Sequence, residues 1–354
     1  MQSSNEQYSF NNKVTTVSFI LAITVMFIHS ENIALYENSH LFVSILEYLI
    51  SHSIGDLAVP TFFMISSYLF YRNFHSNQIL NKYKSRIRSI FFPYLLWNSL
   101  YFIIFYIITL FPTFRTFMTT EQFALSPQLI WEAVFFHKYN NVFWFMQQLI
   151  YFIALSPLVY YVLKGKSGIM LVIICLVIGI YCPMFPNIWY GVKFNMMVYW
   201  FLGCYFAIHK PSLFEKAGKE NFVSLSVFIC IILLIIRFLL DYVLGNLLFF
   251  PILSPILLFI NVPFFWFALS SFIPSKTPWW MQITFFIYAA HPLLVDAWKK
   301  ASAYFLPDNS FLCLANYVLA VIVSFIIIII SAKLLIKFLP KLWTALNGGR
   351  TPTF

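Results

Sequence analysis

Two histidines stand within or at the end of long apolar runs, and their imidazole rings are the groups in this sequence best suited to acid–base chemistry. His29 ends a run that begins at Val17, and His291 precedes Pro292 in a later run. Ionisable residues at membrane depth are costly, so they indicate function. A neutral imidazole accepts a proton near physiological pH, so we predict that His29 acts as a general base on a hydroxyl group.

Each histidine also has a simpler interpretation. His29 could lie near the membrane interface and make only a hydrogen bond. Pro292 has no backbone N–H and frees a carbonyl within its span. His291 could therefore mark a helix kink and satisfy the local backbone, without any contact with a substrate.

Other polar side chains within apolar runs are candidates to line a substrate route. Ser66 and Ser67 are small and polar, so they could contact a substrate or pack and hydrogen-bond between helices. Trp144 begins a run and could equally be an interfacial anchor. Gln147 and Gln148 lie one turn deeper and could hydrogen-bond a polar substrate.

Four cations precede another apolar run, and Arg86 and Arg88 are the ones we predict to bind phosphate. Arginine grips phosphate through a planar fork of donors. Coenzyme A carries phosphates and is cytosolic, so such a phosphate site would lie on the correct side of the membrane for it. The alternative is a basic anchor that contacts anionic lipid.

The composition places these residues in a polytopic membrane protein. Hydrophobic residues make up 61% of the 354 residues and charged residues 10%, whereas soluble domains carry about 25% charged residues. Continuous apolar runs favour helices over a barrel. A span needs about 20 residues, and ten segments approach that length: 14–33, 55–72, 90–112, 142–163, 168–185, 195–209, 222–243, 250–272, 279–298 and 312–336. The polar connection 113–141 could hold a short interfacial helix.

The charge distribution orients these spans. With both termini in the cytoplasm, 16 of the 22 Lys and Arg residues fall on the cytoplasmic side, as expected for membrane proteins. We predict a cytoplasmic N-terminal segment (1–13), one membrane domain (14–336) and a cytoplasmic tail (337–354). The net charge of +10 is thus a topology signal, and we expect no nucleic-acid partner, because no clustered basic face on a soluble module is visible.

Several side chains are predicted to be structural. Arg237 and Asp241, spaced four residues apart in one span, should pair with each other. The five cysteines lie in or beside apolar runs without a Cys-x-x-Cys pair, which favours buried thiols over disulfides. The key histidines lack carboxylate or cysteine partners at ligand spacing, so no metal site is expected.

The chain resembles the integral-membrane acyltransferase-3 family over residues 14–336. Five landmarks occur in order: a first-span His29, the segment from Pro60 to Ser66, Arg86 and Arg88 before Pro93-Tyr94, Trp144-Phe145, and the segment from Ile287 to Pro292 that includes Tyr288.

The resemblance implies a bacterial inner-membrane enzyme that moves an acyl group, most often acetyl, from cytoplasmic acyl-CoA to a hydroxyl of a surface polysaccharide or its lipid-linked precursor. It assigns the essential histidine to His29 and a donor contact to Arg86 and Arg88. Ser66, Ser67, Trp144, Gln147, Tyr288 and His291 would line the route. It implies membrane lipid, a saccharide or glycolipid acceptor and glycan-assembly proteins as partners, with acyl-CoA as donor substrate and no bound cofactor.

The sequence departs from the family pattern at two places. Ser18 stands where the family usually has an arginine, and Ser66-Ser67 replaces a Ser-Gly pair. The sequence leaves two mechanisms open, direct transfer and a covalent acyl-histidine relay. The alternative function is export of a polysaccharide or glycolipid without acyl transfer, although the paired halves of many transporters are not visible.

Overall fold

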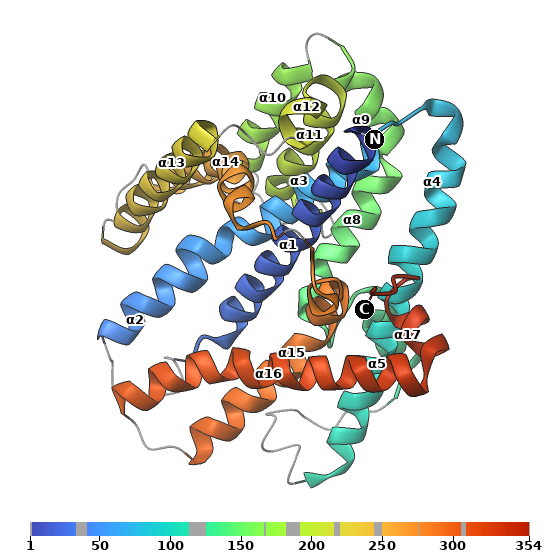
Figure 1. Cartoon of the computed structure of the whole chain (residues 1–354). Helices are drawn as coiled ribbons and strands as arrows, with labels where there is room; N and C mark the ends of the chain where they lie inside the picture. The colour runs from blue at the N-terminus through green and yellow to red at the C-terminus, as the bar shows by residue number, and fades with distance from the viewer. Residues whose placement is uncertain are drawn as a thin grey trace. The chain divides into compact units, whose positions relative to one another are not determined.

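The computed structural model describes residues 2–32, 41–112, 125–165, 168–181, 192–215, 220–243, 250–274, 276–305 and 309–353. Every regular element in these ranges is a helix (Figure 1), which confirms the predicted all-α class. The chain divides into two compact units that are described separately. The first contains residues 1–25, 48–82 and 151–282, and the second contains residues 26–47, 83–150 and 283–354.

The first unit is built around the contact between α3 and α11. Its α-helices are α1 (Gln2–Ser30, whose last turn belongs to the second unit), α3 (Ala58–Tyr71), α4 (Ile79–Arg86, shared with the second unit), α9 (Ser156–Leu163), α10 (Gly168–Tyr181), α11 (Phe194–His209), α12 (Pro211–Glu215), α13 (Glu220–Phe238) and α14 (Phe250–Ala268). Shorter helical turns cover Tyr48–Ile54, Gly55–Leu57, Ser76–Gln78, Leu239–Val243, Leu269–Phe272 and Trp279–Met281.

The second unit is built around the contact between α15 and α16. It contains α2 (Leu41–Glu47), α5 (Phe92–Leu110), α7 (Pro127–Phe135), α8 (Trp144–Ala154, shared with the first unit), α15 (Thr284–Phe305), α16 (Ser310–Phe338), α17 (Pro340–Leu346) and the turns Ile87–Phe91 and Asn141–Phe143. The helix α7 lies in the predicted connection 113–141. Its N-terminus is capped by Ser126 Oγ, which accepts from the Leu129 amide at 3.1 Å, and α16 is capped in the same way by Asn309.

The described residues contain six helical stretches that are long and apolar enough to cross a membrane: Gln7–Ser30, Leu41–Tyr71, Ile79–Leu110, Asn221–Tyr242, Ile252–Phe272 and Ser310–Phe338. Asn141–Ala154 and Ser156–Leu163 meet at 62° and add a seventh if they form one span. The prediction of a helical protein with several membrane spans is therefore confirmed, whereas the predicted number of ten spans is not. Within the described ranges, the helices α10 and α11 have 14 and 16 residues, fewer than the roughly 20 that a span needs.

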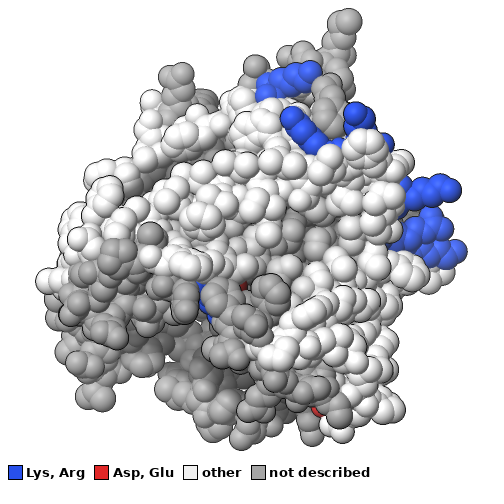
Figure 2. Space-filling view, turned by 90° about the horizontal axis from the view of Figure 1, so that it is seen from below, with Lys and Arg blue, Asp and Glu red and all other residues white. Residues whose placement is uncertain are grey.

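Residues other than Lys, Arg, Asp and Glu cover most of the described surface seen in Figure 2, and lysine and arginine residues gather at its margin. Large apolar side chains stand exposed along α10, α13 and α16, among them Ile173, Phe228 and Ile330. A surface of this kind suits contact with lipid, because lipid chains are as apolar as these side chains.

The contact between α3 and α11 depends on a glycine. A Cβ built on Gly203 would stand 2.1 Å from the Met64 carbonyl oxygen and 2.8 Å from Ser67 Cβ. Ser67 is fully buried there and donates to the Trp200 carbonyl. Small residues of this kind allow two helix backbones to approach closely.

Gly203→Ala is therefore expected to destabilise the protein by about 1–3 kcal/mol, the usual range for overpacking, and thermal unfolding in detergent measures this. The matched control is Gly179→Ala, whose Cβ would lie 3.0 Å from Asn195 Cα and which also gains helix propensity. Equal melting temperatures for the two variants would contradict the close packing of α3 on α11.

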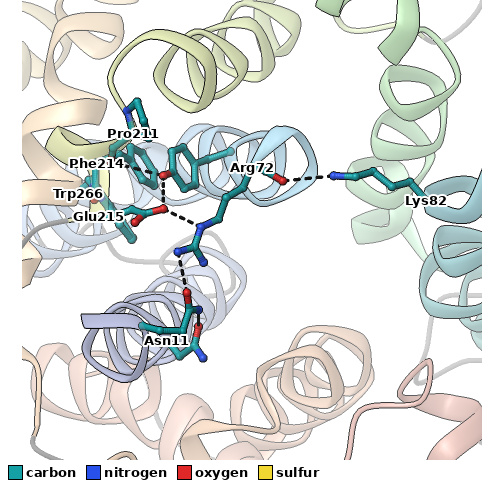
Figure 3. A network of polar contacts seen from close by, with 9 residues as sticks. Asn11, Arg72, Lys82, Pro211, Phe214, Glu215 and Trp266 are labelled. Atoms are coloured by element: carbon teal, nitrogen blue, oxygen red, sulfur yellow. Dashed lines mark hydrogen bonds and ion pairs between the residues drawn. The ribbon is translucent and has the colours of Figure 1, made fainter. Parts of the chain in front are cut away.

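A polar network closes the end of α3 (Figure 3). Arg72 Nε forms an ion pair with Glu215 at 2.6 Å, and its Nη2 donates to Gln7 Oε1 at 2.8 Å. Tyr68 donates its hydroxyl proton to the same Glu215 oxygen at 2.7 Å. Arg72 thus ties the start of α1 and α12 to α3.

Buried charges hold α13 to the start of α3. Arg237 Nε lies 3.3 Å from Asp241, which confirms the predicted pair, and Nη2 lies 2.5 Å from Asp56. Nε also donates to Ser254 Oγ on α14 at 3.1 Å. The side chains of Arg237 and Asp241 are 8% and 5% exposed, whereas that of Asp56 is 39% exposed.

The cysteines in the described ranges, Cys175, Cys204, Cys230 and Cys313, are buried free thiols, as predicted. Cys182, also predicted to be a thiol, lies outside the described residues.

Candidate active site

The second unit brings the two sequence-predicted histidines together. His29 stands in the last turn of α1 and His291 in α15, and their ring centroids are 5.2 Å apart with a tilt of 52°. His29 is half-buried and His291 is fully buried. The residues are 262 positions apart in the sequence, so this contact exists only because α15 packs beside the end of α1 within the same unit.

The chain segment that follows His29 is fixed by polar contacts to three other helices. The Asn32 amide donates to Glu47 Oε2 on α2 at 3.2 Å, and Asn32 Nδ2 donates to the Cys313 carbonyl on α16 at 3.1 Å. Lys299 on α15 donates to the Glu31 carbonyl at 3.1 Å. This support holds the end of α1 in place and with it the His29 ring.

Four residues of this support were not predicted as part of the site: Asn32, Glu47, Asp296 and Lys299. Asp296 and Lys299 pair at 3.6 Å, and together with Glu31 they are the charged groups that act on the His29 ring. Asp296 and Lys299 lie five and eight residues beyond His291 on the same helix, and their own i, i+3 spacing is the sequence signal that could have identified them as a pair.

Tyr288 connects α15 to the start of α8. Its hydroxyl donates to the Val142 carbonyl at 2.6 Å, and its ring stacks on Phe143 with a centroid distance of 5.6 Å. The Tyr288 ring also lies 6.3 Å from His291. Trp144 follows at the first position of α8 and is half-buried.

Gln147 and Gln148 are buried in the first turns of α8. The Gln147 Oε1 atom lies 3.3 Å from His137 Nε2, so its amide already has a partner within the unit. Gln147 thus links α8 to the turn that follows α7.

Arg86 and Arg88 lie where α4 passes through the π-helical turn Ile87–Phe91 into α5. Arg86 is half-buried and Arg88 is exposed. Turns of this type occur often at functional sites. Pro93, near the start of α5, has no N–H to offer to the Ser89 carbonyl four residues earlier.

A third arginine, which the sequence placed only in the C-terminal tail, reaches this turn. Arg350 Nη1 donates to the Ser89 carbonyl at 3.1 Å and to the Asn347 carbonyl at 2.9 Å. Its guanidinium also lies 5.0 Å from the centre of the Phe285 ring. Arg350 therefore satisfies the carbonyl that Pro93 leaves without its helical donor.

Arg350 is exposed as a residue, and its guanidinium lies against the Phe285 ring and the Ser89 carbonyl. Loss of hydration and the nearby charge of Arg86 lower the pKa of Arg350 to about 10. The group therefore stays charged at neutral pH, and Arg86 and Arg350 place two positive charges near each other.

Ser66 and Ser67 belong to the first unit, so they are not among the residues that the second unit brings together. Ser66 is half-buried and Ser67 is engaged with Trp200 as described above. Within the described ranges, no three or more His, Cys, Asp or Glu side chains are grouped in a way that could hold a metal ion.

Comparisons with known proteins identify the family. A family model described as an acyltransferase domain matches residues 17–333, nearly the whole chain. No curated protein and no solved structure matches the chain. The matched range includes both histidines, Arg86 and Arg88, and all the membrane-spanning candidates except the first residues of the first span and the last residues of the final one. The chain therefore belongs to the integral-membrane acyltransferase-3 family and is a membrane acyltransferase.

Proposed function

We propose that this acyltransferase moves an acetyl group from cytoplasmic acyl-CoA to a hydroxyl of a surface polysaccharide or its lipid-linked precursor, in the inner membrane of a bacterium. The observation that carries the proposal is the contact between His29 and His291, at 5.2 Å between ring centroids, in a chain of this family. A half-buried imidazole held at a helix end by polar neighbours is suited to move a proton during acyl transfer.

In the proposed reaction, a ring nitrogen of His29 takes the proton from the acceptor hydroxyl. The hydroxyl oxygen bonds to the thioester carbonyl carbon, which becomes tetrahedral. The carbon–sulfur bond then breaks, and the coenzyme A thiolate leaves with its electron pair and receives the proton from His29. The products are an ester and free coenzyme A, and His29 returns to its neutral form.

The donor would be bound through its phosphates by Arg86 and Arg88, with Arg350 beside them. Arg350 contributes charge, while its Nη1 donor is already used by two backbone carbonyls. Arginine forms charge-assisted hydrogen bonds with phosphate that are stronger than neutral ones. Tyr288, Trp144 and Gln147 would line the acceptor route.

The proposal is tested with purified protein in lipid vesicles, supplied with acetyl-CoA and an extract of surface glycans from the producing cell. Release of free coenzyme A that requires both the extract and the protein supports transfer to a glycan. Release that requires only water and the protein would instead indicate thioester hydrolysis, and movement of glycan across the vesicle without release of coenzyme A would favour an exporter.

Arg86→Ala combined with Arg88→Ala is expected to raise the KM for acyl-CoA at least tenfold. A hydrogen bond to a charged group is worth about 1.5–3 kcal/mol, and 1.4 kcal/mol corresponds to about tenfold in affinity. Initial rates across a range of acetyl-CoA concentrations measure this effect.

The matched control is Lys337→Ala combined with Lys341→Ala. It also removes two cations predicted to be cytoplasmic, from the end of α16 and from α17 of the same unit. A surface cation near lipid contributes only about 1 kcal/mol, so this variant should keep its KM. Equal KM values in both double variants and the wild type would show that Arg86 and Arg88 act as lipid anchors and do not bind the donor.

A further inference from the structure

The proton positions of His291 follow from its neighbours. Its Nδ1 atom lies 2.8 Å from the Tyr288 carbonyl oxygen and 3.2 Å from the Ile287 carbonyl oxygen. Carbonyl oxygens only accept hydrogen bonds, so Nδ1 must carry the proton. Pro292 explains the arrangement, because it has no N–H for the Tyr288 carbonyl four residues earlier and His291 supplies the missing donor.

The opposite ring nitrogen of His291 is consequently an acceptor. With the proton on Nδ1, the Nε2 atom of the neutral ring holds a lone pair and no hydrogen. His291 is fully buried, and its Nε2 atom has no hydrogen-bond partner among the residues that the structure describes. Buried polar atoms in native proteins nearly always have a partner, so an unused acceptor at this position calls for an explanation.

The rings next to His291 limit which group can donate a hydrogen bond to its Nε2 atom. Tyr288 is in contact with His291, but its hydroxyl donates to the Val142 carbonyl. Tyr101, on α5, donates its hydroxyl proton to the carbonyl of Ala289, two residues before His291. The His29 ring, whose centroid lies 5.2 Å from that of His291, is the remaining polar ring in contact with His291 within the described residues. In its neutral form, one of its two nitrogens carries an N–H.

We propose that His291 is a positioning residue for His29: its Nε2 accepts the N–H of the His29 ring and leaves the other His29 nitrogen as the base. This inference rests on the proposed function. When His29 takes the hydroxyl proton, it becomes an imidazolium with two N–H groups, and the second one stays bonded to Nε2. His291 remains neutral throughout, because a second proton would place a charge on a fully buried ring.

Two conservative variants separate this role from a purely structural one. In His291→Asn, the amide NH₂ replaces the Nδ1 donor, and nothing replaces Nε2. In His291→Gln, the longer amide reaches the Nε2 position, and the donor to Tyr288 is lost. Both are assayed for kcat, KM and melting temperature in the intact protein.

The two variants are expected to rank in opposite order for thermal stability and for kcat. His291→Asn should keep most of its thermal stability and KM but lose roughly 10–100-fold in kcat, because small misplacements of a reacting group have effects of this size. His291→Gln should be less stable and retain a higher kcat than His291→Asn. A His291→Asn variant with wild-type kcat would overturn the positioning role and leave only support of the kinked helix.

A measurement on the folded wild-type protein covers the case in which neither variant folds. Histidine labelled with ¹⁵N should show a protonated Nδ1 and a hydrogen-bonded, unprotonated Nε2 for His291, and the Nε2 signal should shift when His29 is replaced by alanine. An identical Nε2 signal in the two proteins would overturn the proposal.

Failure of this inference can be told from failure of the proposed function. If the wild-type protein transfers no acyl group, the proposed function fails. If the wild type is active, His29→Ala is inactive and His291→Asn is fully active, only the positioning role fails.

Discussion

Replacing His29 with alanine is expected to lower kcat for acyl transfer by roughly 10²–10⁴-fold, the usual contribution of a general base. The side chain is half-buried in the last turn of α1, so its loss should change folding little. Initial rates of acetyl-CoA consumption with purified protein, normalised to the folded fraction from size-exclusion chromatography, measure the effect.

His75→Ala is the matched control for this substitution. His75 is exposed in the first unit, and among the described residues its backbone carbonyl accepts from the Gln78 amide. The control should keep the wild-type rate. If His29→Ala and His75→Ala have equal kcat values, His29 has no part in the chemistry and the interfacial interpretation of this residue is correct.

Replacing Arg237 with methionine is expected to lower the free energy of unfolding by about 3 kcal/mol, the low end of the range for breaking a buried ion pair. The substitution leaves two carboxylates without their cation, and Asp241 is 5% exposed. We choose the low end because the Asp56 side chain is 39% exposed and water can solvate its charge. Thermal or denaturant unfolding in detergent provides the measurement.

The control for Arg237 removes the charges together. In the triple variant Arg237→Met, Asp56→Asn and Asp241→Asn, no carboxylate remains to be left uncompensated, so most of the lost stability should return. A triple variant that is less stable than Arg237→Met alone would show that the two carboxylates stabilise the unit independently of the arginine.

The sequence was a good guide to the helical class because long apolar runs leave few alternatives in a membrane. The predicted segments 222–243 and 312–336 correspond closely to the stretches Asn221–Tyr242 and Ser310–Phe338. Hydropathy does not reveal where a helix breaks. The predicted span 142–163 divides at Leu155, where Pro157 offers no amide to the preceding turn, and the predicted segment 55–72 is the second half of a helical stretch that begins at Leu41.

The sequence allowed individual residues of the candidate site to be predicted, but not the contacts between them. His29 and His291 are conspicuous because each is a titratable residue in an apolar run, but no sequence pattern states that two rings 262 positions apart are in contact. The supporting residues were less visible. Asn32, Glu47 and Arg350 stand near helix ends, where polar residues are ordinary, and only the contacts across the second unit give them a role.

The contacts of the C-terminal residues could likewise not be predicted from the sequence. Charge counting placed Arg350 in a cytoplasmic tail, but the tail packs against the turn that carries Arg86 and Arg88. Gly348 has a φ of +60°, and a Cβ at this position would stand 2.5 Å from the Ser89 carbonyl oxygen. A left-handed glycine allows this close approach and brings Arg350 to the carbonyl that Pro93 leaves without its helical donor.

The most direct test of the central claim, acyl transfer that depends on His29, is mass spectrometry of surface glycans and lipids from three cell populations. One carries the wild-type chain, one carries His29→Ala at equal membrane abundance, and one lacks the protein. The account predicts an alkali-labile acyl ester on a saccharide hydroxyl in the first population and none in the other two. Equal ester content in the wild-type and His29→Ala populations would contradict it.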